Sequence, residues 1–176
     1  MPPTRSAMRS PGVGRCIGMV NLDSKLITLT AVFAAIYAAG VVVLAPISYG
    51  IVQVRVSDAL IPLSVIFGWP AICGVTLGCL VANVYGGFGL MDVLLGSIAN
   101  LIAAYSAYRL RKKPFLACIS ASLIVSIIVG SYLWVLFNVP WEVSLLGILT
   151  GSLISINILG YGLLKTLLRI GHTPNA

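Results

Sequence analysis

A few polar side chains stand out because they interrupt long apolar stretches of this chain. Arg55 and Asp58 lie three residues apart, directly before one such stretch. Asp92 and Asn100 lie eight residues apart in another. A helix would place these two on one face, about 12 Å apart along its axis. Three further polar candidates lie near the ends of apolar stretches, and these are Asn83, Asn138 and Glu142.

Binding is the chemistry that these residue types suggest. A charged group within a bilayer is costly and normally faces protein or a water-filled cavity. Carboxylates and amides can accept hydrogen bonds from the ring N–H groups of a planar, nitrogen-rich ligand, while apolar and aromatic walls stack on its faces. We therefore expect a substrate pocket lined by the residues of this set: Arg55, Asp58, Asn83, Asp92, Asn100, Asn138 and Glu142.

Simpler roles remain open for the same side chains. Asp92 and Glu142 suit the first turn of a helix, where a carboxylate favours the helix dipole. Asn138 suits a helix cap, and Asn100 suits a contact between helices. Arg55 and Asp58 can pair with each other. The aromatic residues Tyr85, Tyr132, Trp134 and Trp141 fit a belt at the membrane surface, although Trp141 could also line the pocket.

Catalytic signatures are missing from the sequence. It contains no GxxxxGK[ST], HExxH or GxSxG motif. The single histidine, His172, lies in a polar tail, and the four cysteines form no CxxC pair. We expect no enzymatic activity, no cofactor and no metal, so any ATP hydrolysis belongs to separate partner subunits.

Composition places the chain in a membrane. Hydrophobic residues make up 59% of it and charged residues only 9%, against roughly 25% charged in soluble domains. We predict an all-α integral membrane protein with six transmembrane helices in residues 26–170. A disordered basic tail would precede them in residues 1–25, and a short tail would follow in 171–176. The predicted spans are 26–47, 59–67, 69–85, 90–108, 114–137 and 143–168.

The second span is the exception. It has about nine residues, which is roughly 14 Å of helix, whereas the hydrocarbon core is roughly 30 Å thick. It can cross only if the helix begins near Val52, which would draw Arg55 and Asp58 into the membrane.

Basic residues indicate the topology. All Lys and Arg residues except Arg55 lie in the N-terminal tail, in residues 109–113 or near the C-terminus. The positive-inside rule then places both termini in the cytoplasm of a multi-pass plasma-membrane protein, with the polar candidates toward the outer side. Such scattered bases do not form the continuous basic face that nucleic-acid binding requires.

Small residues recur every four positions, which allows helices to pack closely. Examples are Gly74 and Gly78, and the alanines Ala31, Ala35 and Ala39, with Ala34 and Ala38 forming a parallel ridge.

Several motifs resemble the QueT family of substrate-binding (S) subunits of energy-coupling-factor (ECF) transporters. They are VRVSDAL (54–60), FGWPA (67–71), GCLVAN (78–83) and GLMDVLLGS (89–97). The resemblance covers roughly residues 26–168 and implies the six-helix S-component fold. It also implies import of queuosine precursors of the 7-deazaguanine class. A membrane coupling subunit and a pair of cytoplasmic ATPases would be the partners, with Ala31, Ala35 and Ala39 contacting the coupling subunit.

Two other functions remain open at this point. The same fold could bind another vitamin or nucleobase, because few pocket residues set specificity. The chain could also act alone, as a facilitator or scaffold without ATPase partners.

Overall fold

The computed structural model describes residues 13–49 and 54–170, with side chains from residue 24 onward. Within these ranges all regular secondary structure is helical, which confirms the predicted all-α membrane class. Five helices in the described part of the chain are long and apolar enough to cross a membrane, and the second of the six predicted spans is a shorter apolar segment. The elements are α1 (Val13–Val43), α2 (Ala45–Ser48), η1 (Val56–Leu63), α3 (Ser64–Phe67), α4 (Trp69–Gly86), α5 (Leu90–Arg109), α6 (Pro114–Phe137), α7 (Trp141–Ser152), η2 (Leu153–Gly160) and α8 (Tyr161–Arg169).

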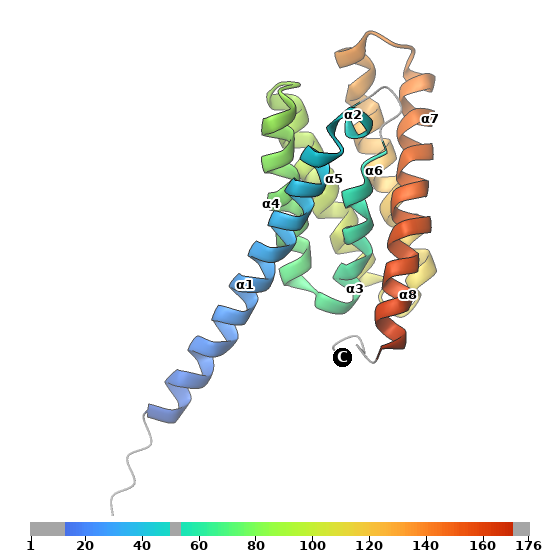
Figure 1. Cartoon of the computed structure of the whole chain (residues 1–176). Helices are drawn as coiled ribbons and strands as arrows, with labels where there is room; N and C mark the ends of the chain where they lie inside the picture. Colours follow the sequence, from blue (N-terminus) through green and yellow to red (C-terminus); the bar gives the residue numbers. More distant parts are fainter. Residues whose placement is uncertain (1–12, 50–53, 171–176) are drawn as a thin grey trace, which may run out of the picture.

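The first helix is longer than the sequence led us to expect. It begins at Val13 rather than near Leu26, so residues 13–25 are helical instead of belonging to a disordered tail. No proline follows Pro11 in this stretch, and nothing there prevents the helix from continuing toward the N-terminus. Figure 1 shows the N-terminal part of α1 projecting away from the bundle. Residues 1–12 and 171–176, where the predicted tails fall, lie outside the described residues.

The short second span lies in the centre of the bundle. It consists of the 3₁₀-helix η1 followed by the single turn α3, and it contacts α1, α4, α5, α6, η2 and α8. At about 2.0 Å per residue in η1 and 1.5 Å in α3 it is about 22 Å long. The described helix begins at Val56, after the expected start near Val52, which lies outside the described residues. Because protein surrounds the segment, it does not have to match the bilayer thickness.

The last predicted span is one continuous helix with a wider segment in its middle. The elements α7, η2 and α8 follow one another without a break from Trp141 to Arg169, and η2 has π-helical geometry. A Cβ atom at Gly160 would lie 3.0 Å from the backbone oxygen of Ala59. The glycine therefore lets η2 approach η1 closely.

The packing of α1 on α4 depends on two glycines. A Cβ atom at Gly78 would lie 2.7 Å from both the backbone oxygen of Ala34 and Cβ of Tyr37, and one at Gly74 would collide with Phe33. Gly74 and Gly78 therefore form a close helix contact, as predicted. Their partner on α1 is the side of the helix that carries Ala34. The other ridge, formed by Ala31, Ala35 and Ala39, is exposed.

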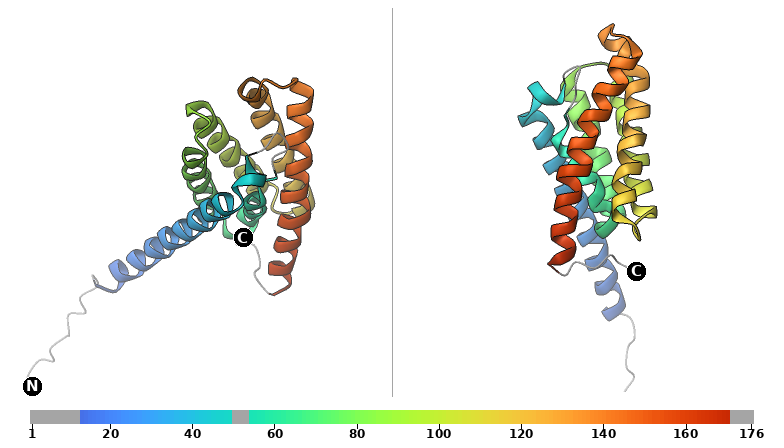
Figure 2. Two further views of the ribbon diagram at one scale, coloured as in Figure 1. Left: turned by 45° about the horizontal axis from the view of Figure 1, so that its top comes forward. Right: turned by 90° about the vertical axis from the view of Figure 1, so that its right-hand side faces the viewer.

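The helix ends separate into two groups. The α4–α5 turn, α2 and the α6–α7 loop lie at the top of Figure 1, and the α3–α4 corner and the end of α8 lie at the bottom. Figure 2 shows the same separation from other sides. The basic residues 109–113 connect α5 to α6 at the lower end.

Candidate functional site

Five of the seven predicted site residues come together inside the bundle. Arg55 precedes η1, Asp58 lies in it, Asn83 is near the end of α4, and Asp92 and Asn100 are in α5. Each has 6% or less of its surface exposed. Charged groups buried this deeply in a membrane helix bundle are functional candidates by default, because their burial costs free energy.

Asn83 joins the arginine to α5. Its side-chain oxygen accepts a hydrogen bond from Nη2 of Arg55 at 2.9 Å, and its Nδ2 donates to the backbone oxygen of Asp92 at 2.9 Å. A Cβ atom at Gly96 would collide with the amide of Asn83. The glycine between Asp92 and Asn100 therefore makes room for this amide.

Asp92 and Arg55 face each other without a direct hydrogen bond. Oδ1 of Asp92 accepts a hydrogen bond from the hydroxyl of Tyr132 at 2.7 Å. Oδ2 lies 3.9 Å from Nη2 of Arg55, which is too long for a hydrogen bond. Both Oδ2 of Asp92 and Nε of Arg55 are buried and have no hydrogen-bond partner. Unsatisfied buried groups are costly, so these two atoms are suited to bond a water molecule or a ligand.

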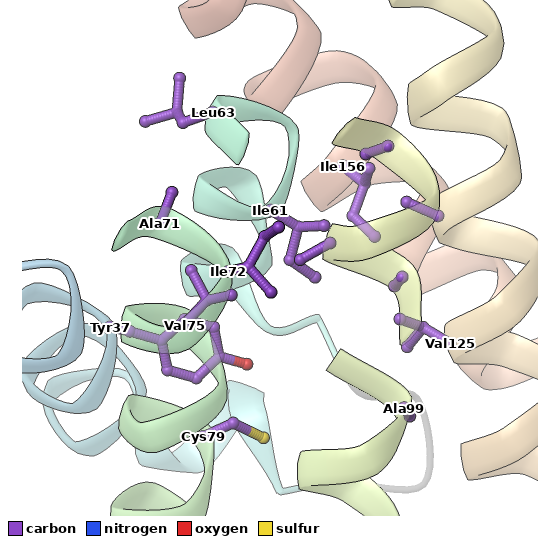
Figure 3. Close-up of a cluster of buried hydrophobic side chains, with 14 of the residues drawn as sticks. Tyr37, Ile61, Leu63, Ala71, Ile72, Val75, Cys79, Ala99, Val125 and Ile156 are labelled. Atoms are coloured by element: carbon purple, nitrogen blue, oxygen red, sulfur yellow. The ribbon is translucent and has the colours of Figure 1, made fainter. Parts of the chain in front are cut away.

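Asp58 belongs to a second set of contacts. Its Oδ1 accepts a hydrogen bond from the hydroxyl of Tyr37, and this hydroxyl accepts one from Nδ2 of Asn100 at 2.7 Å. Figure 3 shows the Tyr37 ring beside Val75, with its hydroxyl directed into the bundle. Asn100 therefore connects α5 to α1, which is the helix-joining role left open above, and it also orients the group that holds Asp58.

A small cavity adjoins this cluster. Its walls are formed by Arg55 and Asp58 on one side and by residues of α6 and α7 on the other, namely Val125, Val129, Ile148 and Ser152. Its volume is about 10 Å³, which is enough for about one water molecule. A ligand the size of a nucleobase therefore requires the surrounding helices to move apart.

Three aromatic rings lie close to the cluster at the upper end of the bundle. Tyr49 follows α2, Phe88 lies in the α4–α5 turn and Phe137 ends α6. The Phe88 ring centroid lies 5.5 Å from that of Tyr49 and 5.4 Å from that of Phe137. The guanidinium of Arg55 lies 5.7 Å from the Tyr49 ring centroid, within the range of a cation–π contact. This aromatic cluster thus joins three connecting segments near Arg55.

The remaining two predicted site residues are exposed. Asn138 ends α6 in a left-handed conformation, with φ of 52°, and Glu142 lies in the first turn of α7. Neither belongs to the buried cluster. Their contact with substrate stays a prediction.

Sequence reasoning missed two tyrosines of the cluster. Tyr132 was expected in the surface belt, and this was wrong, because its side chain is buried and bonded to Asp92. Tyr85, Trp134 and Trp141 are exposed, as a belt requires. Tyr37 was not predicted as a site residue, although its four-residue spacing from Phe33 and Val41 is typical of a buried helix face. No group of histidine, cysteine or carboxylate side chains among the described residues could hold a metal ion.

A family model described as QueT transporter matches residues 27–169. No curated protein and no solved structure matches the chain. The matched region includes the whole buried cluster. It also covers the five membrane-length helices, the first of them from residue 27 onward.

Proposed function

The chain belongs to the QueT transporter family, as its motifs suggested, and we propose that it captures a queuosine precursor of the 7-deazaguanine class for an ECF importer. Family membership makes it a membrane transport protein that handles a small molecule. The substrate, the partners and the orientation are our proposal. The observation that carries it is the buried pair of unsatisfied atoms, Oδ2 of Asp92 and Nε of Arg55.

The chemistry of these two atoms suits a guanine-like ring. Such a ring carries adjacent N–H donors on one edge and a carbonyl acceptor beside them. Oδ2 of Asp92 can accept from the donor edge, and Nε of Arg55 can donate to the carbonyl. Hydrogen bonds to charged groups contribute about 1.5–3 kcal/mol each, which would make these contacts the main determinants of affinity.

The walls of the small cavity suit the faces of the same ring. Val125, Val129 and Ile148 present apolar surface opposite Arg55 and Asp58. An apolar wall with a few converging polar groups is the usual composition of a small-molecule site. We propose that the ligand enlarges this cavity when it binds.

Energy for uptake would come from other subunits. The chain has no P-loop motif, so a membrane coupling subunit and two cytoplasmic ATPases would complete the importer. The exposed alanines Ala31, Ala35 and Ala39 support this assembly, because a row of small residues lets another membrane helix approach closely. Both termini would be cytoplasmic, with the buried cluster nearer the outer surface.

A ligand screen tests the substrate. The purified protein is heated with 7-deazaguanines, guanine, adenine or vitamins, and the shift in Tm is measured. We expect the largest stabilisation from a 7-deazaguanine, because a ligand that binds only the folded state raises Tm. If a vitamin or another base raises Tm more, that compound is the substrate instead of a 7-deazaguanine, and the transport function still holds.

Affinity purification tests the partners. The tagged wild-type protein should recover a coupling subunit with two ATPases from its native membrane, and Ala35→Leu should lose them. Gly162→Leu is the matched control, since a side chain there meets open space on α8. Reproducible recovery of the wild-type chain alone would favour a solitary facilitator.

A further inference from the structure

The lower end of the bundle carries a basic pocket that the transport function does not use. It lies in the α5–α6 loop and has a volume of about 440 Å³. Four of the six described residues that line it are basic, and the six are Arg109, Leu110, Arg111, Lys112, Lys113 and Leu116. None of the described carboxylates lies in this loop, because Asp58 and Asp92 are in the buried cluster and Glu142 begins α7.

An apolar groove lies along α5 and ends about one helical turn before this pocket. Trp69, Leu101, Ile102 and Tyr105 line it, and its volume is about 270 Å³. The ring centroids of Trp69 and Tyr105 are 6.1 Å apart. Leu101, Tyr105 and Arg109 repeat every four residues and are exposed, so they share one face of α5. The groove therefore continues along the helix toward the basic loop.

We propose that the basic pocket and this groove together bind one anionic phospholipid. The exposed bases Arg109, Lys112 and Lys113 would hold the phosphate, with the arginine offering paired donors to its oxygens, and one acyl chain would lie in the groove. Charge complementarity selects this occupant, because clusters of Lys and Arg beside a membrane helix attract anionic lipids. The site lies at the opposite end of the bundle from the buried cluster, so it is independent of the transported substrate.

A second surface groove offers an internal comparison. It lies between α6 and α7, has a volume of about 360 Å³, and is lined by Ile127, Gly130, Ser131, Trp134, Trp141 and Leu145. No basic residue lines it. We therefore expect the groove beside the α5–α6 loop to prefer anionic over neutral lipids, and the groove between α6 and α7 to show no such preference.

The test is lipid binding to the delipidated protein, which native mass spectrometry measures. Phosphatidylglycerol and phosphatidylcholine with identical acyl chains are compared. We expect a preference of roughly tenfold for phosphatidylglycerol.

The double variant Lys112→Gln/Lys113→Gln should lose most of this preference. The matched control Lys165→Gln/Arg169→Gln removes the same charge from the end of α8 and should retain the preference. Equal binding of both lipids, or an unchanged preference in Lys112→Gln/Lys113→Gln, would overturn the proposal.

Two further arms separate a lipid from a free anion. Tyr105→Ala removes part of the groove and should weaken phosphatidylglycerol binding, whereas Trp134→Ala in the other groove should not. Inorganic phosphate at millimolar concentration should compete weakly, since it lacks the acyl contact. Full displacement by phosphate together with no effect of Tyr105→Ala would reassign the pocket to a free anion and contradict the lipid site.

Discussion

The α1–α4 interface and the interface of α6 with α7 and η2 differ in the contacts that hold them together. At the first, Gly74 and Gly78 bring the two helices so close that an added Cβ would meet atoms of α1. At the second, one glycine, Gly130, lies close to Leu145 of α7, and hydroxyl and amide groups make further contacts. The Ser126 and Ser152 hydroxyls are 2.8 Å apart, and Nδ2 of Asn157 donates to Oγ of Ser122 at 2.7 Å.

Only the second interface adjoins the small cavity. Ser152 lies in both the interface and the cavity wall. Close backbone packing has one arrangement and resists separation, whereas each polar contact is modest in energy. We infer that α1, α4 and α5 hold the buried cluster in place while α7 moves away from α6 to admit the ligand.

The largest effect is expected where the α1–α4 interface is broken. Gly78→Leu would drive a side chain into Ala34 and displace Tyr37. We expect little folded protein, because overpacking costs about 1–3 kcal/mol or more and the cluster would lose Tyr37 as well. Size-exclusion chromatography in detergent and the thermal transition measure this. Gly162→Leu is the control, and equal yields of the two variants would show that the α1–α4 contact is not essential.

Locking the other interface should block binding without unfolding the protein. The double variant Ser126→Cys/Ser152→Cys places two thiols where the hydroxyls are 2.8 Å apart. After oxidation we expect the rate of ligand association to fall more than about tenfold, since a covalent link forbids the separation that entry requires. Stopped-flow fluorescence measures the rate, and a reductant should restore it. An oxidised protein that binds as fast as the reduced one would refute movement at this interface.

A smaller effect is expected from removing one hydroxyl beside the ligand site. Tyr37→Phe deletes the donor to Asp58 and the acceptor for Asn100. We expect a loss of about 1–3 kcal/mol in stability and weaker ligand binding, because two buried polar groups lose a partner. Calorimetry measures both quantities. Tyr161→Phe, at a ring that packs on Phe115, should change neither, and identical behaviour of the two variants would remove Tyr37 from the site.

The smallest effect is expected at the exposed end of α7. Glu142→Gln should change ligand affinity less than about twofold, because a solvent-exposed charge without a fixed contact contributes little. Equilibrium binding of a labelled ligand is the measurement. A larger loss would bring Glu142 into the pocket, as the sequence suggested, and would require the α6–α7 loop to close over the ligand.

Spacing along the chain predicted the parts of the site that local geometry decides. The spacing of Asp92 and Asn100 correctly indicated one helix face, and both side chains are buried in the bundle. The glycine pair of α4 correctly indicated a close helix contact. Rules about charge in membranes identified Arg55, because a lone arginine in an apolar region needs protein around it.

Other features depend on contacts between distant segments. Tyr132 looks like a belt residue until α6 packs against α5 and brings it to Asp92, 40 residues away in the chain. The 3₁₀-helix η1 is a short segment that contains Pro62 and is packed on several sides by other helices. Neither feature has a local sequence signal, because both follow from packing.

The most direct test of the account concerns the unsatisfied oxygen of Asp92. Asp92→Asn keeps the shape of the side chain but removes its charge. Its dissociation constant for a 7-deazaguanine should be measured by isothermal titration calorimetry beside that of the wild type, with the Tm of each protein as a check on folding. We predict binding that is roughly 10–100-fold weaker, from the loss of one charge-assisted hydrogen bond. An unchanged dissociation constant in a folded Asp92→Asn protein would contradict the proposal that the buried cluster binds the substrate.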